Sequence, residues 1–84
     1  MKDEKYQKLT QYLLDRGERE IPLSFSQIQE ILGFSLDASA YQYREFWANC
    51  TASTKAYSWM EAGYEITEID LKGQTVLFKQ KNWL

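Results

Sequence analysis

The sequence contains no histidine and a single cysteine, Cys50. Without histidine the chain lacks the most common general base and the most common metal ligand, and a Cys–His nucleophile cannot form. A lone cysteine excludes an internal disulfide and is too little for a thiolate zinc site. The four glycines all fall at the ends of predicted elements, so they form no Gly-rich phosphate loop. We therefore predict that the protein is not an enzyme and uses no metal and no cofactor.

Long apolar stretches are also lacking. Residues 1–5 are mostly charged and contain no apolar leader segment, and the apolar runs elsewhere fall far below the roughly 20 residues of a membrane span. We expect a cytoplasmic protein with no membrane contact. The formal net charge is −2, whereas a free-standing duplex binder usually carries a basic excess. The slightly acidic net charge therefore argues against strong, independent DNA binding, although one face of the domain could still be basic.

Aromatic residues, by contrast, are abundant. The chain of 84 residues carries three Trp, six Tyr and four Phe. This length fits a single domain, residues 1–84. Because a domain of this size buries only about two thirds of its unfolded surface, we expect large rings to supply much of the core.

Local patterns divide the chain into alternating elements. Helices are expected at residues 3–16, 25–32, 38–43 and 55–62, and strands at residues 20–23, 64–71 and 74–79. For residues 44–49 the sequence leaves two conformations possible: an extension of the third helix or a strand-like segment. The fold class is α+β: three to four short helices packed on a small antiparallel sheet with a C-terminal β-hairpin. The order is winged-helix-like, with an extra helix inserted before the wing.

Particular residues set the ends of these elements. Pro22 cannot donate to a strand ladder, so its strand should lie at a sheet edge. Ser24 and Gln27 have the spacing of a capping box that opens the second helix. Three helices should end at a glycine. These are Gly17, Gly33 and Gly63.

The central segment carries a recognisable pattern. It consists of Leu-Gly-Phe-Ser-Leu at residues 32–36, Ser-Ala at 39–40, Tyr-Arg at 43–44, Phe-Trp-Ala-Asn at 46–49, and later Ala56, Trp59 and Ala-Gly-Tyr at 62–64. This pattern resembles a small bacterial domain family of unknown function with the signature LGxxLPxSAxxYRxWWAN followed by AxxWxxAGW. Three positions depart from it: Asp37 stands in place of Pro, Phe46 in place of the first Trp, and Thr51 in place of an acidic residue. Family members occur alone or attached to restriction-type or other DNA-related modules, so the resemblance implies a nucleic-acid context and no particular reaction.

Residues 35–59 form the predicted working surface. The segment contains six rings, at Tyr41, Tyr43, Phe46, Trp47, Tyr57 and Trp59. We expect some of these rings to be exposed, because so small a core cannot enclose them all. Tyr, Trp and Arg are the usual residues of interaction hot spots, and rings beside Arg can stack on unpaired bases. The alternative for Trp47 and Trp59 is that both are core anchors.

Arg44 and Asn49 are the most informative polar residues of this segment. The guanidinium of Arg44 could grip a phosphate or read a guanine edge; alternatively it pairs with Asp37 or Glu45 or stacks on Trp47. Asn49 could hydrogen-bond an adenine edge or, alternatively, cap a turn or the next helix.

The remaining candidates follow from the winged-helix comparison. The third helix would act as a recognition helix, and lysines of the hairpin, including Lys81, could touch phosphates or simply be solvated. The full set of predicted binding residues is Ser39, Tyr41, Gln42, Tyr43, Arg44, Trp47, Asn49, Lys55, Lys72 and Lys79.

Two functions follow from these observations. The first is a non-catalytic, nucleic-acid-associated domain that contacts DNA through the third helix, Arg44 and the hairpin. The second is a protein-interaction module, encoded by a phage or mobile element, that binds a host or defence protein through its aromatic centre. We expect a monomer or a weak homodimer in either case.

Overall fold

Within residues 6–50 and 54–81, the part of the chain described by the computed structural model, four α-helices and one 3-10 helix form the helical part of the protein. They are α1 (Gln7–Arg16), α2 (Phe25–Leu32), α3 (Ser39–Gln42), η2 (Arg44–Trp47) and α4 (Thr54–Glu61). The predicted start of the first helix, residues 3–5, lies outside the described residues. The second helix has the predicted bounds.

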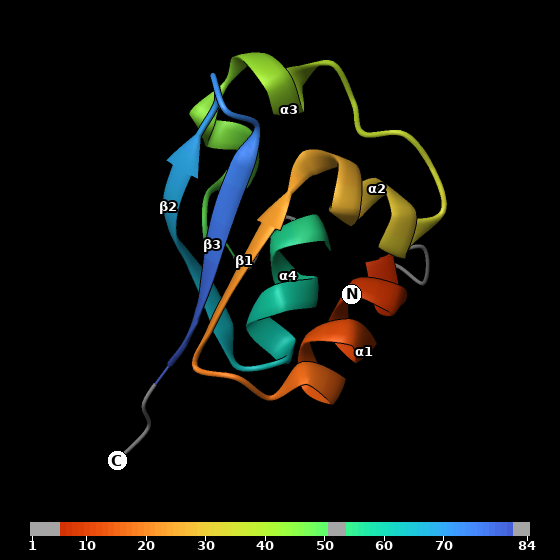
Figure 1. The fold of residues 1–84 in the computed structure, drawn as a ribbon, viewed down its shortest axis with the longest axis vertical. Coiled ribbons are helices and arrows are strands. Elements are labelled where there is room, and N and C mark those ends of the chain that lie inside the picture. The colour runs from red at the N-terminus through yellow and green to blue at the C-terminus, as the bar shows by residue number, and fades with distance from the viewer. Residues whose placement is uncertain (1–5, 51–53, 82–84) are drawn as a thin grey trace.

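Three antiparallel strands form the sheet, in the order β1-β3-β2. They are β1 (Glu20–Ser24), β2 (Tyr64–Asp70) and β3 (Thr75–Gln80). β1 lies at one edge, as Pro22 predicted, and the hairpin strands β2 and β3 close the chain. The predicted α+β fold with a C-terminal hairpin is confirmed (Figure 1).

Local chemistry fixes most of the element ends. The Ser24 hydroxyl accepts a hydrogen bond from the Gln27 amide at 3.1 Å, and the Gln27 side chain accepts one from the Ser24 amide at 2.8 Å, which completes the predicted capping box. All three predicted glycine stops adopt positive φ. The helix ends expected from residue type alone are therefore confirmed.

The centre of the chain differs from the prediction in detail. The third helix is a single turn, because Tyr43 leaves it in an extended conformation (φ −124°, ψ 126°). Residues 44–47 then form a 3-10 helix, and Ala48 returns to extended backbone. Segment 44–49 thus neither prolongs the third helix nor becomes a strand.

The hairpin turn is longer than the Lys72-Gly73 pair suggested. It spans residues 71–74, and its left-handed residue is Gln74 (φ 57°). The Gly73 amide donates to Asp70 Oδ1 at 2.9 Å. A Cβ at Gly73 would lie 2.7 Å from Asp70 Oδ2, so a larger residue there would require the Asp70 side chain to move.

The core lies between the helices and one face of the sheet (Figure 1). Its centre is a chain of rings that joins α2, η2, α4 and β3. Phe25 stacks on Trp47 with ring centroids 5.0 Å apart, Trp47 stacks on Trp59 at 6.2 Å, and Trp59 meets the edge of Phe78 at 5.7 Å. Trp47 and Trp59 are 2% and 1% exposed, so both are core anchors. In residues 6–50 and 54–81, every helix falls short of the length and apolar character that a membrane span requires.

Candidate interaction surface

The corner formed by α3 and η2 is held to the core by its own side chains. Trp47 Nε1 donates to the Ala40 carbonyl at 3.0 Å, which closes the corner on itself. The Tyr41 hydroxyl donates to Gln29 Oε1 at 2.9 Å, and Gln29 Oε1 also accepts from the Leu36 amide at 2.8 Å. These contacts tie the corner to α2 and fix its position relative to the sheet.

Asp37 caps the start of the corner. Its Oδ1 accepts hydrogen bonds from the Ser39 amide at 3.0 Å and from the Ser39 hydroxyl at 2.9 Å. The hydrogen bond from the Ser39 amide lowers the pKa of the Asp37 carboxyl, because it favours the charged form. The Ser39 hydroxyl therefore donates its proton within the corner and is left with acceptor capacity only.

Gln42, Tyr43 and Arg44 remain on the outside of this corner, and we call these three residues the Tyr43 surface. Tyr43 is 56% exposed, and Gln42 and Arg44 are exposed as well. Across the described residues the Arg44 side chain has no hydrogen bond, ion pair or ring contact. Within the described part of the chain, Arg44 therefore neither pairs with an acidic residue nor stacks on Trp47.

The β2–β3 turn, which contains Lys72, lies at the same end of the molecule as α3. The hairpin turn and α3 both project toward the upper end of the long axis in Figure 1, and η2 packs against β2. Lys72 is exposed and, within residues 6–50 and 54–81, makes no ion pair. Lys55, a further candidate, places its ammonium 4.5 Å from the centre of the Phe46 ring.

Lys79, in contrast, is separated from the other candidates. It lies four residues along β3 from Thr75, which at about 3.3 Å per residue is roughly 13 Å from the turn. In register it faces Glu20 on β1 and Glu65 on β2, so two carboxylates flank it across the sheet. Lys79 and Lys81 line a separate hollow of about 400 Å³ with Arg19 and Glu20. The structure thus does not bring the predicted hairpin lysines together.

Asn49 is occupied by the sheet. Its Oδ1 accepts hydrogen bonds from Trp59 Nε1 at 2.8 Å and from the Ile66 amide at 2.9 Å, and its Nδ2 donates to the Ile66 carbonyl at 2.9 Å. The carboxamide therefore pairs with the outer edge of β2 as a neighbouring strand would. With Pro22 on β1, it interrupts both sheet edges, which disfavours a dimer made by strand addition.

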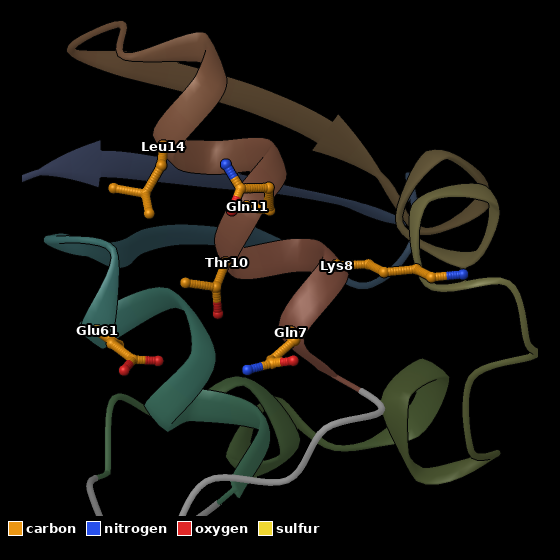
Figure 2. A pocket seen from close by; sticks show the side chains of 6 residues that line it. All are labelled: Gln7, Lys8, Thr10, Gln11, Leu14 and Glu61. Carbon is orange, nitrogen blue, oxygen red and sulfur yellow. The ribbon is translucent and has the colours of Figure 1, made fainter.

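A second hollow lies between α1 and α4 and was not predicted from the sequence. Figure 2 shows its lining side chains, which are Gln7, Lys8, Thr10, Gln11, Leu14 and Glu61. It measures about 440 Å³, and Leu14 is 53% exposed at its side. The Thr10 hydroxyl is used in a buried hydrogen bond to the Ser58 carbonyl at 2.8 Å, which joins the two helices. Its charged lining residues are Lys8 and Glu61.

Potential metal ligands do not cluster in the described part of the chain. In residues 6–50 and 54–81, no three Cys, Asp or Glu side chains gather closely enough to hold a metal ion. Two of the carboxylates in this region accept hydrogen bonds at turns, those of Asp37 and Asp70.

Comparison with known proteins identifies a family. Neither a curated protein nor a solved structure matches the chain significantly. One family model, of a domain without an assigned function, matches almost the whole length. This agrees with the expectation of a small domain of unknown function. With residues 6–82 matched, the chain belongs to the family described as Domain of unknown function (DUF7662).

Proposed function

We propose that the protein is a small non-catalytic binding domain that contacts the backbone of nucleic acids through the Tyr43 surface and Lys72. The observation that carries this proposal is the free guanidinium of Arg44 beside the exposed ring of Tyr43, on a corner that is fixed to the core. A guanidinium can bind a phosphate through two parallel hydrogen bonds. Because the corner is held by Trp47 and Tyr41, little conformational entropy is lost when it binds.

The topology supports the same proposal. A closing β-hairpin was expected from the winged-helix comparison, and in this proposal the turn of the β2–β3 hairpin contacts the phosphate backbone together with the Tyr43 surface. Here α3 and the β2–β3 turn project toward one end of the molecule (Figure 1). The resemblance to a bacterial family found with restriction-type modules favours the same context.

Charge sets the expected strength of binding. Arg44 and Lys72 supply two phosphate contacts, which gives a slope of about −1.8 in log K against log salt. Between about 50 and 200 mM salt, binding should therefore weaken by roughly twelvefold. With a net charge of −2 and so few contacts, we expect affinities no tighter than about 1 μM.

The direct test is fluorescence anisotropy with a labelled oligonucleotide at about 50 mM salt. Arg44→Ala should weaken binding about tenfold, because it removes one charge-assisted contact. Lys79→Ala is the matched control: it removes the same charge from an exposed residue at the other end of β3, and it should change binding less than about twofold. Equal losses in the two variants, or no binding by the parent protein, would refute the proposal.

A protein partner is the second candidate function. Glu45 follows Arg44 directly and is exposed, so the corner carries both signs of charge beside an aromatic ring, as many protein interfaces do. A phage or mobile-element protein that binds a host or defence protein would fit this surface. It predicts no oligonucleotide binding at low salt, together with a saturable complex with a purified partner that Tyr43→Ala abolishes while the fold is retained.

A further inference from the structure

We infer that the Tyr43 surface selects single-stranded over duplex nucleic acid, with the Tyr43 ring stacked on an unpaired base and Arg44 on the neighbouring phosphate. This inference rests on the proposed function and narrows its ligand class. Three observations carry it: the exposure of one ring, the shortness of α3, and the small number of free cations.

Tyr43 is the ring available for stacking. Of the rings between residues 35 and 59 that the structure describes, Trp47 and Trp59 are buried and Tyr41, Phe46 and Tyr57 are partly buried, whereas Tyr43 is 56% exposed. An exposed ring offers a face to any base, and stacking of this kind contributes strongly to binding of single strands. In a duplex the faces of the bases are already stacked on one another, so the ring would gain nothing there.

The helix α3 is too short to read a duplex groove. Its four residues form a single turn that rises only about 6 Å. Ser39 is bonded to Asp37, Ala40 is buried and Tyr41 is bonded to Gln29. Gln42 is thus the one side chain of α3 left to meet a base edge, whereas recognition helices present three or four. The predicted recognition-helix role is not supported by this geometry.

The free cations also suit a single strand. Arg44 and Lys72 are free of acidic partners in the described residues, and the exposed carboxylates of Glu45, Glu68 and Asp70 lie close to them along the chain. A second phosphate backbone would be repelled by these carboxylates. Arg44 together with the exposed Tyr43 ring instead matches a short stretch of one strand, bound through phosphate and base together.

The experiment compares two labelled probes by anisotropy at low salt: oligothymidine of about 12 nucleotides and a duplex of the same length. The single strand should bind at least about tenfold more tightly than the duplex. Tyr43→Leu should weaken single-strand binding about tenfold, whereas Tyr43→Phe, which keeps the ring, should stay within about twofold of the parent protein. Unchanged thermal unfolding of both variants would show that the fold is intact, as expected for an exposed side chain.

The outcomes separate this inference from the proposed function. Duplex binding equal to single-strand binding, with no effect of Tyr43→Leu, would overturn the inference. If Arg44→Ala still weakened that binding, the proposed function would stand. Absence of binding to either probe would overturn both.

Discussion

Asn49→Ala is the substitution that probes the architecture of the proposed surface most sharply. The Asn49 carboxamide joins the end of η2 to α4 through Trp59 and to β2 through Ile66, so it holds the corner that carries the Tyr43 surface against the sheet. Alanine removes all three hydrogen bonds and supplies no replacement for them.

The expected cost follows from the groups left behind. Each hydrogen bond contributes about 1 kcal/mol net, and an unsatisfied buried donor costs about 1–3 kcal/mol. Trp59 is 1% exposed, so its indole N–H has little access to water once Asn49 is shortened. We estimate a loss of about 3 kcal/mol in the free energy of unfolding, out of roughly 4–13 kcal/mol for a domain of this size. The melting temperature should fall by about 12–24 °C.

Urea and thermal unfolding, followed by circular dichroism and tryptophan fluorescence, measure this loss. Asn49→Asp keeps the acceptor oxygen for Trp59 and Ile66 but loses the donor, so it should lie between alanine and the parent protein. Gln42→Ala removes a nearby exposed amide and is the matched control, with an expected change within about 0.5 kcal/mol. A cost for Asn49→Ala below about 1 kcal/mol, or equal to that of the control, would refute this reasoning.

The other predictions concern single groups of the fold. Gly63→Ala should lower the free energy of unfolding in urea by about 1 kcal/mol because φ is 88° at this residue, even though no described atom lies within 4 Å of the added Cβ. Asn tolerates this conformation better, so Gly63→Asn should cost less. Equal costs for the two variants would contradict the conformational explanation. The Tyr64 hydroxyl donates a hydrogen bond to the Glu18 carbonyl, and burial raises its pKa. The contribution of this hydroxyl to stability is therefore fully present below the unfolded pKa of about 10, and it is lost as pH rises through the folded pKa. Tyr64→Phe should remove that alkaline dependence, and an unchanged stability profile between about pH 9 and 12 would argue against it. Hydrogen bonding by Ser39 lowers the pKa of the Asp37 carboxyl. The contribution of this carboxylate to stability is therefore present above the unfolded pKa of about 4 and is lost as pH falls through the folded pKa. Asp37→Asn should flatten the acid limb of the stability profile, and an unchanged acid limb would contradict this assignment. Trp47→Ala should cost about 3–5 kcal/mol, since it removes the ring between Phe25 and Trp59, and a loss below about 1.5 kcal/mol would contradict the packing.

Local chemistry explains which parts of the fold could be predicted from the sequence. The second helix is bounded by a capping box at Ser24 and a left-handed glycine at Gly33, and both act within a few residues of chain. Pro22 fixes an edge position because it lacks an N–H, whatever the rest of the sheet does. These elements therefore follow from residue type and spacing alone.

The central corner depends on contacts between distant residues. Trp47 is placed by Phe25 and Trp59, and the path after it is set by the pairing of Asn49 with Ile66, which is 17 residues away in sequence. Spacing along the chain contains no signal for such pairings. Residues 44–47 therefore form a 3-10 helix, whereas the sequence had suggested either an extension of the third helix or a strand-like segment.

The candidate site shows the same division. Counting rings predicted that some would be exposed, and Tyr43 is, while Trp47 is enclosed. Composition could not show which ring would remain outside, because that depends on the extended residue that ends α3. Nor could it show that Lys79 faces Glu20 and Glu65, since this register is fixed only when β3 lies between its two neighbours.

Amide chemical-shift mapping during titration with oligothymidine tests the central claim most directly, because it reports where the ligand lies. We predict that the largest changes fall on residues 42–45 and Lys72, with little change at Lys79 or along α1. Changes centred on the hollow lined by Arg19 and Lys79, or on the hollow between α1 and α4, with Tyr43 and Arg44 unaffected, would contradict the account.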